Sequence, residues 1–166
     1  MPVSNPGYLR SFYNASQALG AKVISSDFTF EIEGFEQNYL LCKQAPWAQV
    51  SVAGEIEVPT VLGAASLQPQ QARVNHQGQI ALEETIAGSI DNMLINLIAS
   101  GGTFNAKMYE GTPQKFLRAK RYEDCFIQCD NPDRDWENRS QILLFTGTMF
   151  FHYFGEVIPG NSGDYT

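Results

Sequence analysis

The side chains that could carry catalysis are few in this sequence, and they stand apart from one another. His76 lies in a polar stretch, and His152 lies inside an aromatic run. A catalytic or zinc-binding histidine needs a partner such as a second ligand, a nucleophile or an orienting carboxylate. Neither histidine has another histidine or a cysteine at ligand spacing. We interpret both as surface or packing residues.

The cysteines give no sign of redox or metal chemistry. Cys42 is isolated, and Cys125 and Cys129 are separated by three residues, whereas zinc knuckles and redox pairs have two. On a strand, positions four apart point the same way but lie too far apart for a disulfide. We expect reduced, buried thiols, no cofactor and no metal, and synthesis in the cytosol.

Two acidic groups were considered as catalytic or metal sites. Glu83 and Glu84 are adjacent, so on a strand they face opposite sides and do not share a proton; a solvated edge is the alternative. The acidic residues between 130 and 137 lack the glycine and the terminal glutamate of a calcium loop. The chain also lacks a phosphate-binding glycine loop and a nucleophile elbow. We therefore predict that it is not an enzyme.

The charge balance argues against a nucleic-acid-binding surface. Eleven lysines and arginines stand against eighteen acidic residues, which gives a net charge of −7. A nucleic-acid-binding protein needs a basic surface. The one basic run contains Lys115, Arg118, Lys120 and Arg121, and we interpret it as a solvated or subunit-facing stripe.

The elements that position these residues fit one domain over residues 1–166. The start of the chain lacks the basic and apolar parts of a signal peptide, and no stretch has the roughly 18 apolar residues of a membrane span. Three segments show no core periodicity: an N-terminal arm over 1–26 with a short helical piece near 10–19, an exposed loop over 59–73 and a C-terminal arm over 156–166.

The remaining segments alternate as half-buried strands do. Phe28, Phe30 and Ile32 begin this pattern, and residues 39–43, 48–58 and 73–86 continue it. One helix is expected over residues 89–100, capped by Ser89 and ended by two glycines. Its apolar stripe has helical spacing and comprises Ile90, Met93, Leu94, Leu97 and Ile98.

Three strands follow this helix, over residues 103–109, 115–128 and 140–154. The last strand is almost wholly apolar or aromatic, which predicts that both of its faces are covered. One face can pack on the core of the domain, and the other needs a partner subunit or a helix. We predict a mainly β fold, an antiparallel β-sandwich or barrel with one flanking α-helix.

The order of these features resembles the tail tube proteins of contractile-tailed bacteriophages, whose superfamily includes the type VI secretion tube. The resemblance is carried by residues 135–140, which begin Asp135-Trp136, by the aromatic strand over 142–155, and by residues 39–46. Residues 50–75 match in place the long hairpin between early strands of the family, and a strand over 80–86 leading into the helix matches as well. The resemblance covers roughly residues 25–156.

The resemblance implies a homo-hexameric ring in which strands of each subunit join one intersubunit β-barrel, and rings that stack into a tube. The intersubunit strand implied by the resemblance carries Phe145, Phe150, Phe151, Tyr153 and Phe154. The loop implied to reach the next ring carries Val61, Leu62, Leu67 and Gln70. Candidates for an acidic lumen wall are Glu31, Glu33, Glu55, Glu57, Glu83 and Glu84. Asp91 and Asn96 are the candidates for contact with the sheath.

The function implied is that of a structural subunit of the channel that conducts viral DNA inside a contractile sheath. The partners would be the sheath protein and the baseplate and tail terminator proteins, with viral DNA passing through the lumen without specific binding. The location would be the virion tail, assembled in the cytoplasm of a bacterial host. The alternatives are the tube of a pyocin-like or type VI machine, a baseplate tube initiator, and a small-ligand-binding β-barrel.

Overall fold

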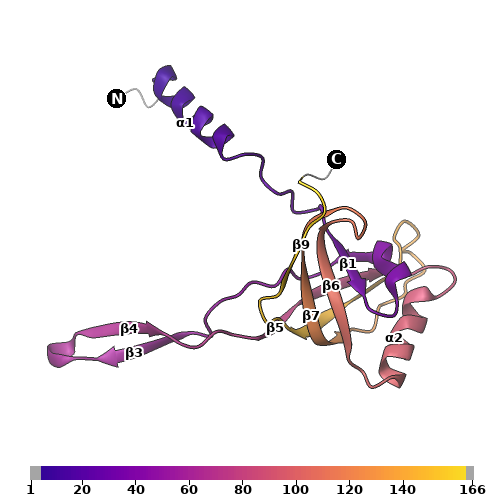
Figure 1. Ribbon diagram of the computed structural model, residues 1–166. Helices are drawn as coiled ribbons and strands as arrows, with labels where there is room; N and C mark the ends of the chain where they lie inside the picture. Colours follow the sequence, from indigo (N-terminus) through magenta and orange to yellow (C-terminus); the bar gives the residue numbers. More distant parts are fainter. Residues whose placement is uncertain (1–4, 164–166) are drawn as a thin grey trace.

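The computed structural model describes residues 5–163 and shows a β-sheet body from which two thin arms project (Figure 1). Seven strands form one antiparallel sheet in the order β1-β6-β7-β8-β5-β2, with β9 beside β7. The strands are β1 (Thr29–Ile32), β2 (Cys42–Gln44), β5 (Asn75–Glu83), β6 (Phe104–Gly111), β7 (Phe116–Cys129), β8 (Leu144–His152) and β9 (Val157–Pro159). The mainly β antiparallel fold is confirmed, and the sheet is not closed into a barrel.

The long strand β7 belongs to both halves of this sheet. Its first part pairs with β6 and β9, and its second part pairs with β8. The register shifts between Glu123 and Phe126, and Asp124 has a φ of 47°. Such a bulge increases the local bend of a strand. The bend divides the sheet into two layers. One layer contains β2, β5, β8 and the end of β7, and the other contains β1, β6, β9 and the start of β7.

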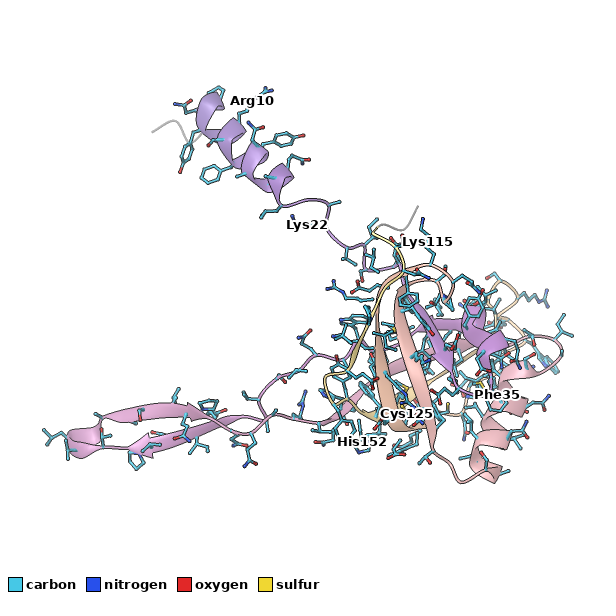
Figure 2. All side chains as sticks on the ribbon, viewed as in Figure 1. Arg10, Lys22, Phe35, Lys115, Cys125 and His152 are labelled. Atoms are coloured by element: carbon cyan, nitrogen blue, oxygen red, sulfur yellow. The ribbon has the colours of Figure 1, made fainter. Side chains whose placement is uncertain are left out.

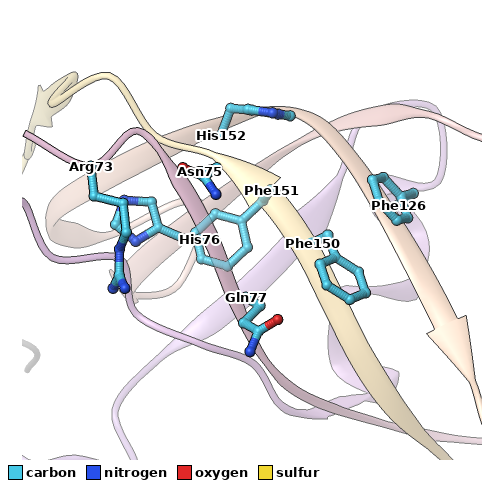
Figure 3. A pocket seen from close by; sticks show the side chains of 8 residues that line it. All are labelled: Arg73, Asn75, His76, Gln77, Phe126, Phe150, Phe151 and His152. Carbon is cyan, nitrogen blue, oxygen red and sulfur yellow. The ribbon is translucent and has the colours of Figure 1, made fainter. Parts of the chain in front are cut away.

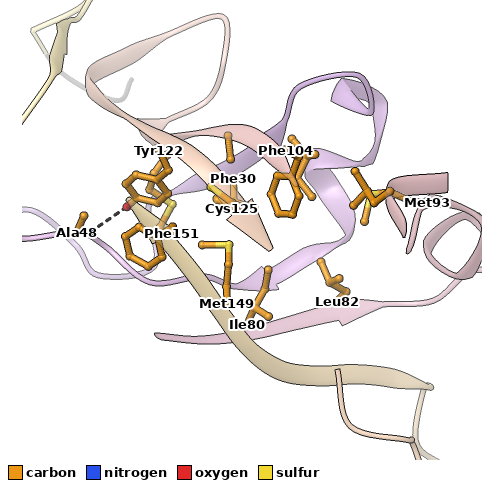
Figure 4. Close-up of a cluster of buried hydrophobic side chains, with 14 of the residues drawn as sticks. Phe30, Ala48, Ile80, Leu82, Met93, Phe104, Tyr122, Cys125, Met149 and Phe151 are labelled. Carbon is orange, nitrogen blue, oxygen red and sulfur yellow. Dashed lines mark hydrogen bonds between the residues drawn. The ribbon is translucent and has the colours of Figure 1, made fainter. Parts of the chain in front are cut away.

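The core lies between the two layers (Figure 4). Phe30 and Met108 come from one layer, and Ile80 and Met149 come from the other. In β8 the alternation is regular, because Met149 and Phe151 are buried while Thr148 and Phe150 are not. The strand is shorter than the predicted 140–154, and its outward face carries threonines as well as Phe150. One face packs on the core as expected, and cover of the other face by a partner subunit stays a prediction.

Helix α2 (Ser89–Ala99) covers one end of the core and confirms the predicted helix. Ile90, Met93 and Leu97 are buried, whereas Ile98, predicted to be on the core face, is exposed. Ser89 is not the N-cap; that position is Gly88, and the helix start is capped by a carboxylate from outside the helix.

Residues 36–50 differ most from the sequence prediction. The expected strand over 39–43 is mainly a 3₁₀ helix, Glu36–Leu41, followed by the short strand β2. After Gln44 the chain leaves the sheet edge and crosses the inner face, where Pro46 packs so closely on Gly78 that a Cβ at Gly78 would lie 2.3 Å from the Pro46 Cβ. Ala48 is then buried in the core. The expected strand over 48–58 is reduced to β3 (Glu55–Pro59).

The first arm is helix α1 (Pro6–Ala18), which agrees with the helical piece predicted near 10–19 but begins earlier. The second arm is a hairpin of β3 and β4 (Ala65–Pro69), joined by the 3₁₀ turn Val61–Gly63. The expected loop over 59–73 is thus the tip and return strand of a hairpin. The expected C-terminal arm is partly β9, which pairs with β7, and its last residues, 164–166, lie outside the described part.

The basic run is not one continuous exposed stripe. Lys120 is buried and donates to the Ala48 carbonyl oxygen, with its ammonium over the Trp47 ring. Arg118 is about half exposed and forms an ion pair with Glu110 at 2.8 Å. The interpretation as a solvated stripe was therefore wrong for Lys120, whose buried charge needs these partners. A subunit-facing role for the other cations stays a prediction.

Candidate assembly interface

The outward face of the β5-β8-β7 layer is polar and almost uncharged. The antiparallel register aligns Gln77 with Phe150 and Phe126, and Gln79 with Thr148 and Gln128. The rings of Phe126 and Phe150 stack with their centroids 5.0 Å apart (Figure 3). The middle of the face therefore consists of amides, a hydroxyl and one aromatic pair. Acidic residues lie at its ends: Glu83 and Asp130 at one end, and Glu123 in the row of Asn75 and His152 at the other.

Both edges of this layer, the outer edge of β5 and the outer edge of the end of β7, are open beside the polar face. Residues 75–80 of β5 pair with β8 on one side, while β2 reaches only Ala81 and Leu82 on the other. Residues 126–129 of β7 likewise pair with β8, while β6 reaches only Cys125. Within residues 5–163, no strand covers either edge. Open edges of this kind are ready templates for pairing with another chain.

A hollow of ≈ 350 Å³ lies at the open edge of β5, between His76, Phe150 and Phe126 (Figure 3). The His76 ring stacks on Phe151, with centroids 5.5 Å apart. Burial, together with the nearby positive charge of Arg73, lowers the pKa of His76, so the ring is neutral at pH 7. Its Nε2 atom is buried and has no hydrogen-bond partner among the described residues. Such orphaned polar atoms are rare in folded proteins.

The hairpin arm has no layer beneath it. Every residue of β3 and β4 is exposed, including the apolar side chains of Ile56, Val58 and Leu67. At the tip, Leu62 is fully exposed and has a φ of 58°, a left-handed conformation that leucine rarely adopts. An exposed apolar side chain on a strained backbone favours a role in contacts outside the chain.

The opposite end of the same layer carries a second exposed apolar group. The hairpin joins β5 beside Asn75, which pairs with His152, whereas the β7–β8 loop joins β8 beside Leu144, which pairs with Glu83. Trp136 in this loop is 95% exposed. A hollow of ≈ 470 Å³ lies beside it, lined by loop residues that include Pro132 and Ile142. The two ends of one sheet thus carry the hairpin and this loop.

The six carboxylates proposed for a lumen wall do not gather on one face. Glu83 lies on β5 at the end of the polar face. Glu55 and Glu57 lie on the hairpin arm. Glu33 lies 3.6 Å from the Arg121 guanidinium, and Glu31 accepts a long hydrogen bond from Tyr109 at 3.5 Å.

Glu84 has a structural role. Its carboxylate accepts from the backbone N–H groups of Thr85, Ile90 and Asp91 at 2.8–3.0 Å. Partial burial opposes ionisation, but these three donors together hold the pKa of Glu84 below its usual value. Both oxygens are therefore engaged at the start of α2.

The five aromatic residues expected on an intersubunit strand are divided by the alternation of β8. Phe151 and Tyr153 are buried in the core, and Phe145 is half-buried against it. Phe150 lies on the polar outward face, and Phe154 is exposed beyond the end of the strand. Asp91 and Asn96 are exposed on α2.

Sequence reasoning missed Phe126 and His76 as interface candidates. Phe126 looked like one more apolar residue of a strand, and only the bulge in β7 turns it outward. His76 was interpreted as a surface or packing residue, and its stacking on Phe151 depends on the register of β5 against β8. A signal was available in the glutamines at 77 and 79, which alternate with core positions.

Within residues 5–163, no group of three or more histidine, cysteine and acidic side chains is arranged to hold a metal ion. In the same range, no helix has the length and apolar character needed to cross a membrane.

The chain matches no protein-family model and no curated protein sequence. Solved structures do match its fold. A chain of the sheath–tube complex of the PVC extracellular contractile injection system is 14% identical with a TM-score of 0.57, over 87% of this chain and 95% of that one. A chain of the PVC sheath/tube terminator is 14% identical with a TM-score of 0.57, over 84% and 97%. The tube-terminating cap of the anti-feeding prophage is 13% identical with a TM-score of 0.55, over 82% and 89%.

The protein therefore shares its fold with components of contractile injection systems. This confirms the resemblance to tail tube proteins at the level of the fold.

Proposed function

We propose that this chain is a tube subunit of a contractile tail or related injection particle. One observation carries the proposal: a layer with a polar outward face ends on both sides in an uncovered strand edge. A folded chain that exposes two edges of one layer can join copies of itself side by side. Joining them in a closed circle pairs both open edges of this layer, and an edge that is already paired cannot template aggregation.

In this ring, residues 75–80 of one subunit pair with residues 126–129 of the next. The proposed ring has six subunits, as the resemblance implies. The neighbouring strand fills the hollow beside Phe126 and Phe150, and it supplies a polar group to the orphaned Nε2 atom of His76. Burial of a neutral imidazole with a partner at this edge is more favourable than burial without one.

The outward face of the layer then becomes the wall of the channel. Amide and hydroxyl side chains such as Gln77, Gln79 and Thr148 do not attract phosphate, because non-specific DNA binding depends on cationic side chains. A neutral polar wall lets a polyanion such as viral DNA pass without sticking. This proposal replaces the acidic wall with one whose middle is uncharged and whose carboxylates, Glu83, Asp130 and Glu123, lie at its two ends.

Stacking of rings follows from the two ends of the layer. We place the hairpin tip, with Val61 and Leu62, against the β7–β8 loop of the subunit in the next ring, with Leu67 and Gln70 along the shaft of the hairpin. The exposed face of α2, with Asp91 and Asn96, is the surface proposed for the sheath. The particle would be assembled in the host cytoplasm with its baseplate and terminator.

The experiment is negative-stain electron microscopy of the purified chain, alone and with a preformed baseplate. We expect rings or tubes of one width. The matched variant replaces residues 55–69 with the turn Asn-Gly, because the Gly54 carbonyl already accepts from the Gln70 N–H at 2.9 Å and the two strands meet there. This variant should form rings that do not stack. A chain that stays monomeric under all these conditions would contradict the proposal.

A second candidate is a ring that ends a tube or starts one at the baseplate, because the similar structures include a terminating cap, a terminator and a baseplate. Such a protein would form single rings that bind the end of a tube. Tubes of many layers from the unmodified chain would exclude it.

A further inference from the structure

Within residues 5–163, helix α1 has an apolar stripe that packs on no other helix or strand (Figure 2). Tyr8 and Phe12 pack edge to face with their centroids 4.6 Å apart, and Leu9 and Tyr13 extend the stripe along the helix. Each of these side chains is more than half exposed, and the helix has no buried residue. The opposite face carries Arg10, the one charged residue of the helix. A helix of this length is marginal in water by itself, so its stripe calls for a partner surface.

An unfilled apolar hollow lies where the linker of α1 meets the body. Its volume is ≈ 420 Å³, and its floor is formed by Phe28, Trp47 and Met108. Val23 and Ile24 of the linker form one wall. Phe28 and Trp47 pack on the buried core from this side, so the hollow is the open mouth of the core between the two layers.

The hollow and the helix are complementary in size and in apolar character. A space of this volume accommodates the two or three aromatic and aliphatic side chains that one helical stripe presents. Of the charged residues that line the hollow, Glu110 is already paired with Arg118, and Asp27 and Lys43 balance each other. With Arg10 on the opposite face of the helix, a docked stripe would bury no unpaired charge in the hollow.

We propose that α1 of one subunit docks in this hollow of a second copy of the chain and acts as a strap between subunits. The occupant is a second copy because the connection points away from the body: the linker runs outward, and Gly20 has a φ of 85° (Figure 1). The linker over residues 20–26 spans up to roughly 25 Å, which is enough to reach a neighbour. Val23 and Ile24 of the linker form one wall of the hollow in the same chain. To reach its own hollow, the helix would have to fold back over these two residues, so a neighbouring hollow is the more accessible one. The strap depends on the proposed function in one respect, because it requires that copies of the chain lie next to each other.

The test uses two singly substituted full-length chains, one with Ser16→Cys and one with Ser25→Cys. Ser16 lies on the apolar stripe of α1, and Ser25 lines the hollow. The chains are mixed, allowed to assemble, oxidised and separated without reductant. The native thiols interfere little, because burial raises the pKa of Cys42 and Cys125 to about 12 and also raises that of Cys129.

The expected result is a disulfide-linked pair that contains one chain of each kind. The control replaces Ser16→Cys with Asn14→Cys, on the polar face of the helix, and should give several-fold less product. Phe12→Ser added to the Ser16→Cys chain should lower the yield as well.

Three results would overturn the strap. A third full-length chain carries both Ser16→Cys and Ser25→Cys, and one overturning result is a disulfide that forms only within this chain. Another is binding of the full-length chain to anionic lipid vesicles without a cross-link. The third is rings or tubes in the microscope with no cross-link between chains, which leaves the proposed function intact. Cross-linked pairs without rings or tubes would support the strap and contradict the tube.

Discussion

The hydroxyl of Tyr122 accepts a hydrogen bond from the Ala48 N–H at 2.9 Å. The same hydroxyl donates to the Pro46 carbonyl oxygen at 2.8 Å, and the ring stacks on Phe151 in the core. One phenol therefore holds the segment that crosses the inner face of the sheet. Because this segment is held there, it does not pair with β5, and residues 75–80 keep an open edge.

The first prediction concerns this hydroxyl. Tyr122→Phe leaves a buried N–H and a partly buried carbonyl without their partner, so the free energy of unfolding should fall by about 1–3 kcal/mol. Urea unfolding measures the change. The control is Tyr109→Phe, which removes only a long contact of 3.5 Å to Glu31 and should cost less. Equal losses in the two variants would contradict the role given to Tyr122.

The second prediction concerns the cap of α2. Glu84→Ala removes the acceptor of the Ile90 and Asp91 N–H groups and should lower the free energy of unfolding by about 0.5–2 kcal/mol. Glu83→Ala, one residue earlier, is the matched control and should change stability little. Thermal or urea unfolding of both variants at pH 7 provides the comparison.

The stabilisation that the Glu84 cap gives to the folded chain is expected to decrease at acidic pH. Because the folded state lowers the pKa of Glu84, its stabilising effect is complete above the unfolded pKa of about 4.3 and is lost as the pH falls through the lower folded value. The difference in stability between the unmodified chain and Glu84→Gln should therefore shrink below about pH 4. A difference that grows toward acid would show that the carboxylate is not the cap.

The third prediction concerns the hairpin tip. Leu62 is fully exposed and adopts a left-handed conformation that glycine adopts without strain. Leu62→Gly should leave the stability of the monomer unchanged or slightly higher, while it reduces the length of tubes seen by electron microscopy. Leu67→Ser, on the shaft of the hairpin, provides a comparison without a change in backbone strain. Tubes of normal length from Leu62→Gly would remove the tip from the proposed contact between rings.

The fourth prediction concerns the edge of β7. Phe126→Lys places a charge where the proposed neighbour would pair, and it should abolish rings without unfolding the chain, because Phe126 lies on the outward face. Ile98→Lys on α2 changes an exposed apolar residue of similar kind away from both edges and should leave ring formation intact. Size-exclusion chromatography and circular dichroism separate loss of assembly from loss of fold.

Much of the body could be predicted because its elements bury one face each. The spacing of Ile90, Met93 and Leu97 predicts α2, and the alternation that includes Phe30 and Ile32 predicts β1 with one face in the core. The hairpin arm shows the limit of this reasoning. Ile56 and Val58 alternate with glutamates as in a half-buried strand, yet both faces of β3 are exposed because no second layer lies beneath it. The alternation in the sequence indicates which side chains of a strand are apolar. It does not indicate which element of the same chain or of another subunit covers them.

The candidate interface was harder to predict because its residues are chemically ordinary. Gln77, Gln128 and Thr148 come from three strands and meet only through the register. Lys120 was misinterpreted for a related reason. A lysine usually faces solvent, but here the Ala48 carbonyl and the faces of Trp47 and Tyr153 surround its ammonium inside the body.

The placement of the hairpin and the β7–β8 loop at opposite ends of one layer gives any stack of these subunits a direction. One terminal layer always presents free hairpins, and the other always presents free loops. Growth by addition of identical layers cannot stop by itself, since every new layer recreates the surface it has just covered. If the subunits stack as proposed, a finished particle needs two different closing proteins, one shaped to receive hairpins and one shaped to receive loops.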